Sequence, residues 1–114
     1  MNANRYMRAC LQTADRSDLE RLQLECALDL CSEAGRLARQ MLQNFLYGHK
    51  PDKRYMIDKL GDTAWCLAVL CDAIGSDLDM IMEENLKKLE QRYPDGFDSE
   101  KSIHRKEYEQ HEVR

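Results

Sequence analysis

Apolar residues recur close to the helical period along most of the chain, with polar residues between them. The first such stretch predicts one long helix from about Ser17 to Leu46. Ser17 and Glu20 form a capping-box pattern at its start. Gly48 and Pro51 follow it and supply a short connection. The apolar positions expected to face the core are Leu24, Leu28, Cys31, Leu37, Ala38, Met41, Leu42 and Phe45.

Two further helices are predicted after this connection. The second runs from about Asp52 to Gly75, and the short link that follows forces an antiparallel return. The third begins near Asp77 and ends at Tyr93, because Pro94 disfavours helix in the residue before it. Residues 1–14 are expected to form a short helix packed against the others. The inward positions are Tyr55, Leu60, Ala64, Leu67, Leu70 and Ile74 on the second helix, and Leu78, Ile81, Met82, Leu86 and Leu89 on the third.

These patterns predict an all-α fold, because no stretch shows the alternation of apolar and polar residues that is typical of strands. The chain has 114 residues, which is enough for one helical core but not for two. We expect a helical domain at residues 1–94 and a charged C-terminal extension at residues 95–114. Three amphipathic helices in so short a chain leave an apolar face uncovered, which favours self-association.

The charge balance excludes several classes of function. A formal net charge of −4 and a pI near 5.4 argue against a general nucleic-acid or membrane-surface binder, since such proteins carry a basic field. No apolar run approaches the length of about 18 residues needed for a membrane span, and the N-terminus lacks the apolar core of a signal peptide. We therefore expect a soluble, cytoplasmic protein with no nucleic acid and no membrane among its partners.

The five cysteines do not indicate a metal site or a disulfide framework. They contain no C-x-x-C pair, their number is odd, and the three histidines are scattered. Free cysteine commonly acts as a small buried apolar residue. We expect Cys10, Cys26, Cys31, Cys66 and Cys71 to be reduced thiols in the core.

Two motifs give the chain its closest resemblance to a known family. Residues 60–65 read L-G-D-T-A-W, and residues 85–97 read N-L-K-K-L-E-Q-R-Y-P-D-G-F. This pairing resembles the MazG-like nucleoside triphosphate pyrophosphohydrolases, an all-helical family that releases pyrophosphate from nucleoside triphosphates. The resemblance spans about residues 22–105. It implies an antiparallel helix bundle of the all-α pyrophosphohydrolase type, a nucleotide or nucleotide-derived partner, and a homo-oligomer, either a dimer or a tetramer.

The resemblance also locates a magnesium site that is degenerate in this chain. In the family, a glutamate pair on the first core helix faces an E-x-x-D pair on the second, and the four carboxylates hold Mg²⁺. The matching positions here are Glu33, Arg36, Lys59 and Asp62. Two acids and two bases sum to zero where the family has −4, so this site is poorly suited to a divalent cation. Glu33 and Asp62 are the ligands if a metal is retained; we expect no cofactor otherwise, and Mg²⁺ only if the protein is an active enzyme.

The register of an antiparallel hairpin places these four residues in one layer, because 33 plus 62 equals 36 plus 59. Within this layer Glu33 is expected to meet Lys59 diagonally, and Arg36 to meet Asp62. Three interpretations stay open. The layer is an internal ion-pair network of an oligomeric scaffold, or its bases take the place of metal ions in holding phosphate. In the third interpretation, an active hydrolase uses Glu25 or Asp29 as substitute ligands.

The third helix matches the family better than the metal site does. Asn85, Lys88 and Arg92 are three and four residues apart, so one helix face offers an amide and two cations. The resemblance associates these positions with holding substrate, and Tyr93 belongs to the same matched run. The predicted nucleotide-binding residues are therefore Arg36, Lys59, Asn85, Lys88, Arg92 and Tyr93.

Residues beside the degenerate metal site carry further expectations. Trp65 lies on an apolar helix face, and core packing is favoured for it over stacking on a base. Gly35 and Gly61 lie inside helices, where each is less favourable than alanine by about 1 kcal/mol. We expect neighbouring helices to approach closely at these glycines, which compensates for the lost helix stability.

Taken together, the residues predict a MazG-like protein that binds a nucleotide or nucleotide-derived signal with weak or no hydrolysis. The alternatives are an active Mg²⁺-dependent pyrophosphohydrolase and a non-catalytic oligomeric scaffold.

Overall fold

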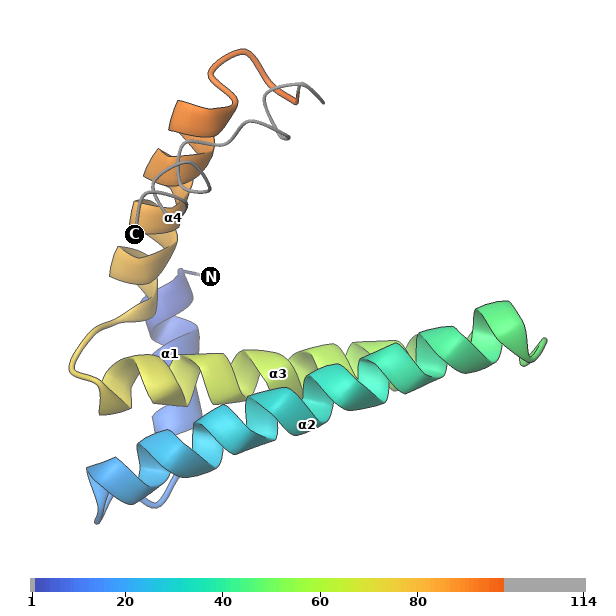
Figure 1. The fold of residues 1–114 in the computed structure, drawn as a ribbon. Coiled ribbons are helices and arrows are strands. Elements are labelled where there is room, and N and C mark those ends of the chain that lie inside the picture. Colours follow the sequence, from blue (N-terminus) through green and yellow to red (C-terminus); the bar gives the residue numbers. More distant parts are fainter. Residues whose placement is uncertain (1, 98–114) are drawn as a thin grey trace, which may run out of the picture. The chain divides into compact units, whose positions relative to one another are not determined.

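The computed structural model describes residues 2–97, and these residues form four helices and no strand (Figure 1). The predicted all-α fold is therefore confirmed for this part of the chain. No helix among these residues has the length and apolarity needed to cross a membrane. The helices are α1 (Ala3–Leu11), α2 (Leu19–Leu46), α3 (Lys53–Ala73) and α4 (Leu78–Arg92).

The chain divides into two compact units, Met1–Asp79 and Met80–Arg114, so α4 begins in the first unit and lies mostly in the second. The proposed boundary after residue 94 stays a prediction, and most of the charged extension lies outside the described residues. The part of the family resemblance beyond residue 97 also lies outside the described residues.

Helix ends follow the turn residues closely. The Asp52 side chain accepts a hydrogen bond from the Tyr55 amide at the start of α3, and Gly75 has a φ of 82° just beyond its end. Glycine adopts this left-handed conformation without the steric penalty of other residues. The predicted ends of the three long helices are confirmed to within two residues.

The start of α2 corrects one prediction. The N-cap is Asp18, whose side chain accepts a hydrogen bond from the Arg21 amide. Ser17 instead donates its amide and its hydroxyl to Asp15, at 3.0 and 2.7 Å. The capping box at Ser17 is therefore wrong, because the neighbouring aspartate provides the stronger acceptor and Ser17 is used in the preceding turn.

Replacing the two candidate cap residues separately distinguishes their roles. We expect Asp18→Ala to lower the free energy of unfolding by about 1 kcal/mol, because it leaves an amide of the first helical turn without an acceptor. Ser17→Ala is expected to lower it by less than about 0.5 kcal/mol. Urea denaturation of both variants measures the difference, and an equal loss in both would contradict the assignment of Asp18 as the cap.

In the first unit, α2 and α3 lie antiparallel side by side, and α1 packs against α3 (Figure 1). The Trp65 indole nitrogen donates to the Thr13 hydroxyl at 2.7 Å, which ties the segment after α1 to α3. Arg16 forms an ion pair with Asp72 at 2.6 Å in the same region. The predicted packing of the N-terminal helix is confirmed. The buried apolar residues of this unit are Met7, Cys10, Leu22, Cys26, Cys66, Ala68, Val69, Cys71, Ala73 and Leu78.

The apolar stripe expected to face the core from α2 lies mostly on its outer side. Leu24, Leu28 and Phe45 are 61%, 59% and 81% exposed, whereas Leu22, Cys26 and Glu33 are the buried residues of this helix. Leu24 follows Leu22 by two residues, a rotation of about 200°, so the two sets lie on opposite sides of the helix. The inward assignment is wrong because a periodic pattern identifies an apolar face without identifying the helix that covers it.

The same correction applies in part to the other two long helices. Exposed positions that were expected to face inward are Met41 and Leu42 on α2, Leu60, Leu67 and Ile74 on α3, and Met82, Leu86 and Leu89 on α4. Leu78 is buried and Leu70 and Ile81 are half-buried, as expected. A Cβ built on Gly35 or Gly61 meets no atom within 4 Å, so the close approach expected at these glycines is not made in the described structure.

The cysteines are free thiols, and the structure confirms burial for four of the five. Burial raises the pKa of the Cys66 thiol to about 11 and also raises the pKa of Cys26 and of Cys71. Such thiols stay protonated and unreactive near neutral pH. Cys31 is exposed on the outer side of α2, so its predicted core position is wrong.

Candidate functional site

The four charged residues at the degenerate metal positions share one layer of the α2–α3 hairpin. Lys59 Nζ on α3 lies 3.7 Å from Glu33 Oε2 on α2, which confirms the expected pairing across the hairpin. Arg36 Nη1 donates to Glu33 Oε1 at 3.2 Å, and Lys59 Nζ donates to Asp62 Oδ2 at 3.1 Å. The expected pairing of Arg36 with Asp62 is wrong, because each base forms its hydrogen bond with the acid three residues away on its own helix.

Lys59 is the centre of this layer. Its amine lies within 4 Å of three carboxylates, those of Glu33, Asp58 and Asp62, and its side chain is only 13% exposed. The hydrogen bond to Asp62 and the negative charge of Glu33 raise the pKa of Lys59 above its ordinary value. The ammonium group therefore stays charged at neutral pH and occupies the space between the carboxylates.

Glu33 is the buried acid of the layer, with a side chain that is 11% exposed. Its Oε1 accepts the hydrogen bond from Arg36, while its Oε2 is buried and has no hydrogen-bond partner. A buried carboxylate is unfavourable unless neighbouring charge compensates it. Lys59 provides that charge. Arg36 is the more accessible base, with a side chain that is 54% exposed.

An open hollow of about 270 Å³ lies beside this layer. Its lining residues are Asp29, Ser32, Glu33, Arg36, Asp62, Trp65 and Cys66. Asp29 precedes Glu33 by four residues, and Cys66 follows Asp62 by four, so each pair shares a helix face. This spacing is the sequence signal by which Cys66 could have been assigned to the site, and Ser32 carries no comparable signal.

These residues do not fit the magnesium site that the family resemblance implies. Hard divalent cations require several oxygen ligands with excess negative charge. Here the Lys59 ammonium lies among the carboxylates that would serve as ligands. Within residues 2–97, no three His, Cys, Asp or Glu side chains form a group that could hold a metal ion. A site built on Glu33 and Asp62 would have to displace the Lys59 amine before it could accept a cation.

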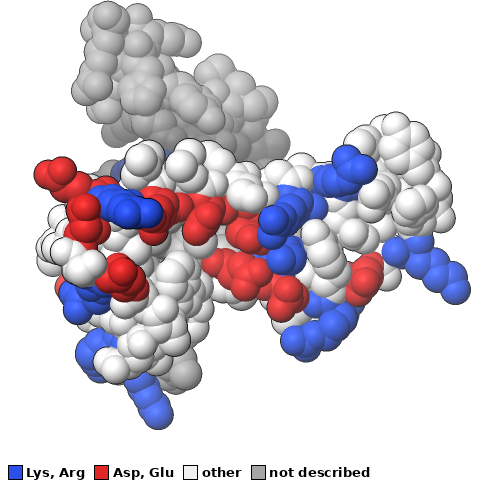
Figure 2. Space-filling model, turned by 90° about the horizontal axis from the view of Figure 1, so that it is seen from below, with Lys and Arg blue, Asp and Glu red and all other residues white. Residues whose placement is uncertain are grey.

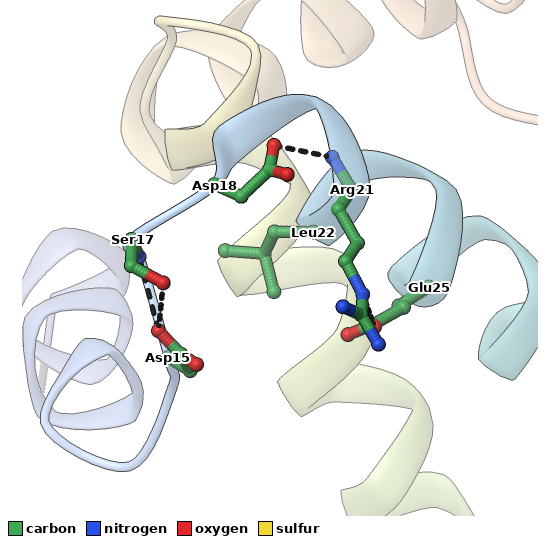
Figure 3. A pocket seen from close by; sticks show the side chains of 6 residues that line it. All are labelled: Asp15, Ser17, Asp18, Arg21, Leu22 and Glu25. Carbon is green, nitrogen blue, oxygen red and sulfur yellow. Dashed lines mark hydrogen bonds and ion pairs between the residues drawn. The ribbon is translucent and has the colours of Figure 1, made fainter.

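Glu25, one of the two proposed substitute ligands, lines a different hollow near the start of α2 (Figure 3). Arg21 Nε donates to Glu25 Oε1 at 2.8 Å, so this carboxylate is already ion-paired. Asp29 is the substitute ligand that shares a hollow with Glu33 and Asp62. Of the two, the geometry therefore favours Asp29.

The predicted substrate-holding residues of α4 belong to the second unit, whereas Arg36 and Lys59 belong to the first. Asn85 and Lys88 are exposed, and Arg92 and Tyr93 are half-buried. The Tyr93 ring lies 6.0 Å from the Phe97 ring, centroid to centroid. That both groups contact one nucleotide stays a prediction.

Trp65 lies at the edge of the hollow rather than wholly in the core. Its ring is half-buried, and its indole nitrogen is held by Thr13. Core packing is thus only part of its role, because Trp65 also lines the open hollow. Base stacking on this surface stays a prediction.

No protein-family model, no curated protein and no solved structure matches this chain in comparisons with known proteins. The MazG-like assignment therefore stays a prediction that rests on the motifs at residues 60–65 and 85–97.

Proposed function

We propose that this protein is a MazG-like nucleotide-binding protein that hydrolyses its ligand weakly or not at all. The observation that carries the proposal is the position of the Lys59 amine, within 4 Å of Glu33, Asp58 and Asp62. A lysine ammonium placed among these acids compensates their charge as a metal ion would, but it cannot activate water as a Lewis acid. Binding without efficient turnover is the expected consequence.

Arg36 is the residue of the first unit best suited to contact phosphate. Its guanidinium lines the open hollow, is half-exposed and holds a single hydrogen bond to Glu33. A guanidinium presents several donors in a planar fork, so it can keep one bond to a carboxylate and direct others to a phosphate. Lys59 is more enclosed and has three acidic partners, so we assign it to neutralising the layer.

The exposed face of α4, in the second unit, carries candidate ligand-binding groups of its own. Asn85 and Lys88 are exposed one turn apart, and Arg92 follows on the same face. An amide recognises a base edge or a sugar hydroxyl, and the cations recognise phosphate. This combination supports a nucleotide as the ligand class.

We expect the wild-type protein to lack efficient Mg²⁺-dependent pyrophosphohydrolase activity. The physical reason is that the layer would have to exchange the Lys59 ammonium for a metal ion. Pyrophosphate release should be measured with common ribo- and deoxynucleoside triphosphates in the presence of Mg²⁺ or Mn²⁺. A kcat of about 1 per second or above would contradict the proposal. If Asp29→Asn abolished such turnover, the active-hydrolase alternative with Asp29 as a ligand would be the better account.

A non-catalytic oligomeric scaffold is the second candidate, and one observation favours it. Three ion pairs join the layer in the first unit: Arg36 with Glu33, Lys59 with Glu33, and Lys59 with Asp62. These pairs balance the charge of the layer without a ligand. A nucleotide titration separates the two candidates, because the scaffold requires no nucleotide binding at any concentration at which the protein stays folded.

A further inference from the structure

The outer side of α2 carries an apolar stripe that no other helix of the first unit covers. Its large members are exposed, and from Leu24 to Phe45 its spacing alternates between four and three residues, as in helices that pack along their length. Apolar side chains of this size are rarely left in a continuous exposed row unless another surface covers them. The stripe, called the outer stripe below, consists of Leu24, Leu28, Cys31, Gly35, Ala38, Leu42, Phe45 and Leu46.

Four leucines of the outer stripe form two pairs that are symmetric about Gly35. Leu28 and Leu42 stand seven residues before and after it, and Leu24 and Leu46 stand eleven residues before and after it. Small residues, Cys31 and Ala38 among them, occupy the middle. Two copies of α2 that cross antiparallel at Gly35 would thus place large side chains opposite large ones and small side chains at the crossing point. This self-complementarity is what a two-fold symmetric contact requires.

The space at Gly35 agrees with such a crossing. A Cβ at this position would meet no atom within 4 Å, so nothing within the described chain requires a glycine there. Glycine inside an exposed helix is destabilising by about 1 kcal/mol relative to alanine. Close approach of a second helix backbone would account for it, because a missing side chain lets two helix axes come unusually near.

Charge along the hairpin decides the direction of the crossing. Residues 15–33 contain six acids and two bases, whereas residues 36–54 contain five bases and one acid. Figure 2 shows a band of acidic side chains along the middle of the first unit, with basic side chains more frequent toward the hairpin tip and some also at the opposite end. An antiparallel crossing places the acidic half of one copy beside the basic half of the other, and a parallel crossing would bring like charges together.

We propose that the outer stripe of α2 packs against the outer stripe of a second copy of this chain, antiparallel and with two-fold symmetry about Gly35. The contact extends along a helix of 28 residues, a length of about 42 Å. It gives the predicted homo-oligomer a defined surface. It does not use the hollow beside Glu33, so it stands or fails independently of nucleotide binding.

Cysteine cross-linking near the symmetry axis tests the proposal and leaves Gly35 in place. Arg39→Cys sets a new thiol opposite Cys31 of the other copy, and we expect mild oxidation to convert most of the protein to a covalent dimer. Wild-type protein should not cross-link through Cys31. Its two copies would stand eight residues apart along the antiparallel helices, about 12 Å, which is beyond the reach of a disulfide. Glu25→Cys, also exposed on α2, is the matched control and should not cross-link.

A pair of charge variants provides a second test that needs no disulfide. Leu28→Glu alone should weaken the dimer, as should Leu42→Lys alone. Mixing the two variants should restore a heterodimer, because the antiparallel crossing sets residue 28 of one copy opposite residue 42 of the other. Light scattering measures the association in each case, and circular dichroism checks that each variant is helical.

Three results would overturn the proposal. The first is a wild-type mass of about 13.4 kDa at all working concentrations, which would mean that another segment of the same chain covers the stripe. The second is cross-linking of wild-type protein through Cys31, which would indicate a parallel contact. The third is a dimer that neither Leu28→Glu nor Leu42→Lys weakens, which would place the interface elsewhere.

Discussion

The double variant Arg36→Glu with Lys59→Glu is expected to bind Mn²⁺ at least tenfold more tightly than the wild-type protein. The substitutions change the summed charge of the four layer positions from zero to −4 and remove the ammonium group from among Glu33, Asp58 and Asp62. Clustered carboxylates with excess negative charge are what hard cations require. Calorimetry should show a dissociation constant on the order of 10⁻³ M or tighter, the range of weak carboxylate sites.

The control is Arg36→Gln with Lys59→Gln, which removes the same two positive charges without adding carboxylates. We expect it to gain less affinity than the glutamate pair, since charge removal alone supplies no ligand. Hydrolysis returns in the glutamate variant only if the groups that orient the ligands are also present. A folded glutamate variant with no gain in Mn²⁺ affinity over this control would contradict the assignment of these four positions to a former metal site.

Lys88→Ala is expected to weaken nucleotide binding by about 10- to 150-fold, or about 1.5 to 3 kcal/mol, the value of a hydrogen bond to a charged group. Lys88 is exposed on the α4 face that also carries Asn85 and Arg92. Lys87→Ala is the matched control, because Lys87 is also exposed and carries the same charge but points about 100° away around the helix.

Equilibrium titration of both variants with the tightest-binding nucleotide distinguishes a positioned contact from general charge attraction. A positioned contact requires a large loss for Lys88→Ala and a change of less than about threefold for Lys87→Ala, the effect expected of a distant surface charge. Equal losses of nucleotide affinity in the two variants would show that α4 attracts the ligand only through its overall positive charge.

The helix ends were predictable because local chemistry determines them. Gly75 and Pro94 end helices through their own backbone restrictions, whatever the rest of the chain does. The N-cap of α2 was predicted at Ser17, one residue before the observed cap at Asp18. Both are good cap residues, and the choice between them depends on the turn before them. In the structure Asp15 holds Ser17, which leaves Asp18 to cap the helix.

The partner of each helix face was harder to predict than the face itself. Leu24 and Leu28 were recognised as an apolar stripe, but the spacing carries no information about whether α3 or a second molecule covers it. The layer itself was predictable, because the register of an antiparallel hairpin brings residues 33, 36, 59 and 62 together. Glu33 and Lys59 then meet diagonally across it, as expected, because their charges are opposite. The bond between Arg36 and Glu33 was missed, since contacts within a helix compete with contacts across the hairpin at similar distances.

Nucleotide titration of the wild-type protein in the presence of a chelator tests the central claim most directly. The panel should contain mono-, di-, tri- and cyclic nucleotides, with folding and oligomeric state checked in the same samples. We expect at least one nucleotide to bind equally well with and without the chelator, and its affinity to fall as the salt concentration rises, because charge attraction between protein bases and phosphate supplies much of the binding energy. Absence of binding across the panel by folded protein would contradict the account and leave Glu33, Arg36, Lys59 and Asp62 as an internal ion-pair layer of a scaffold.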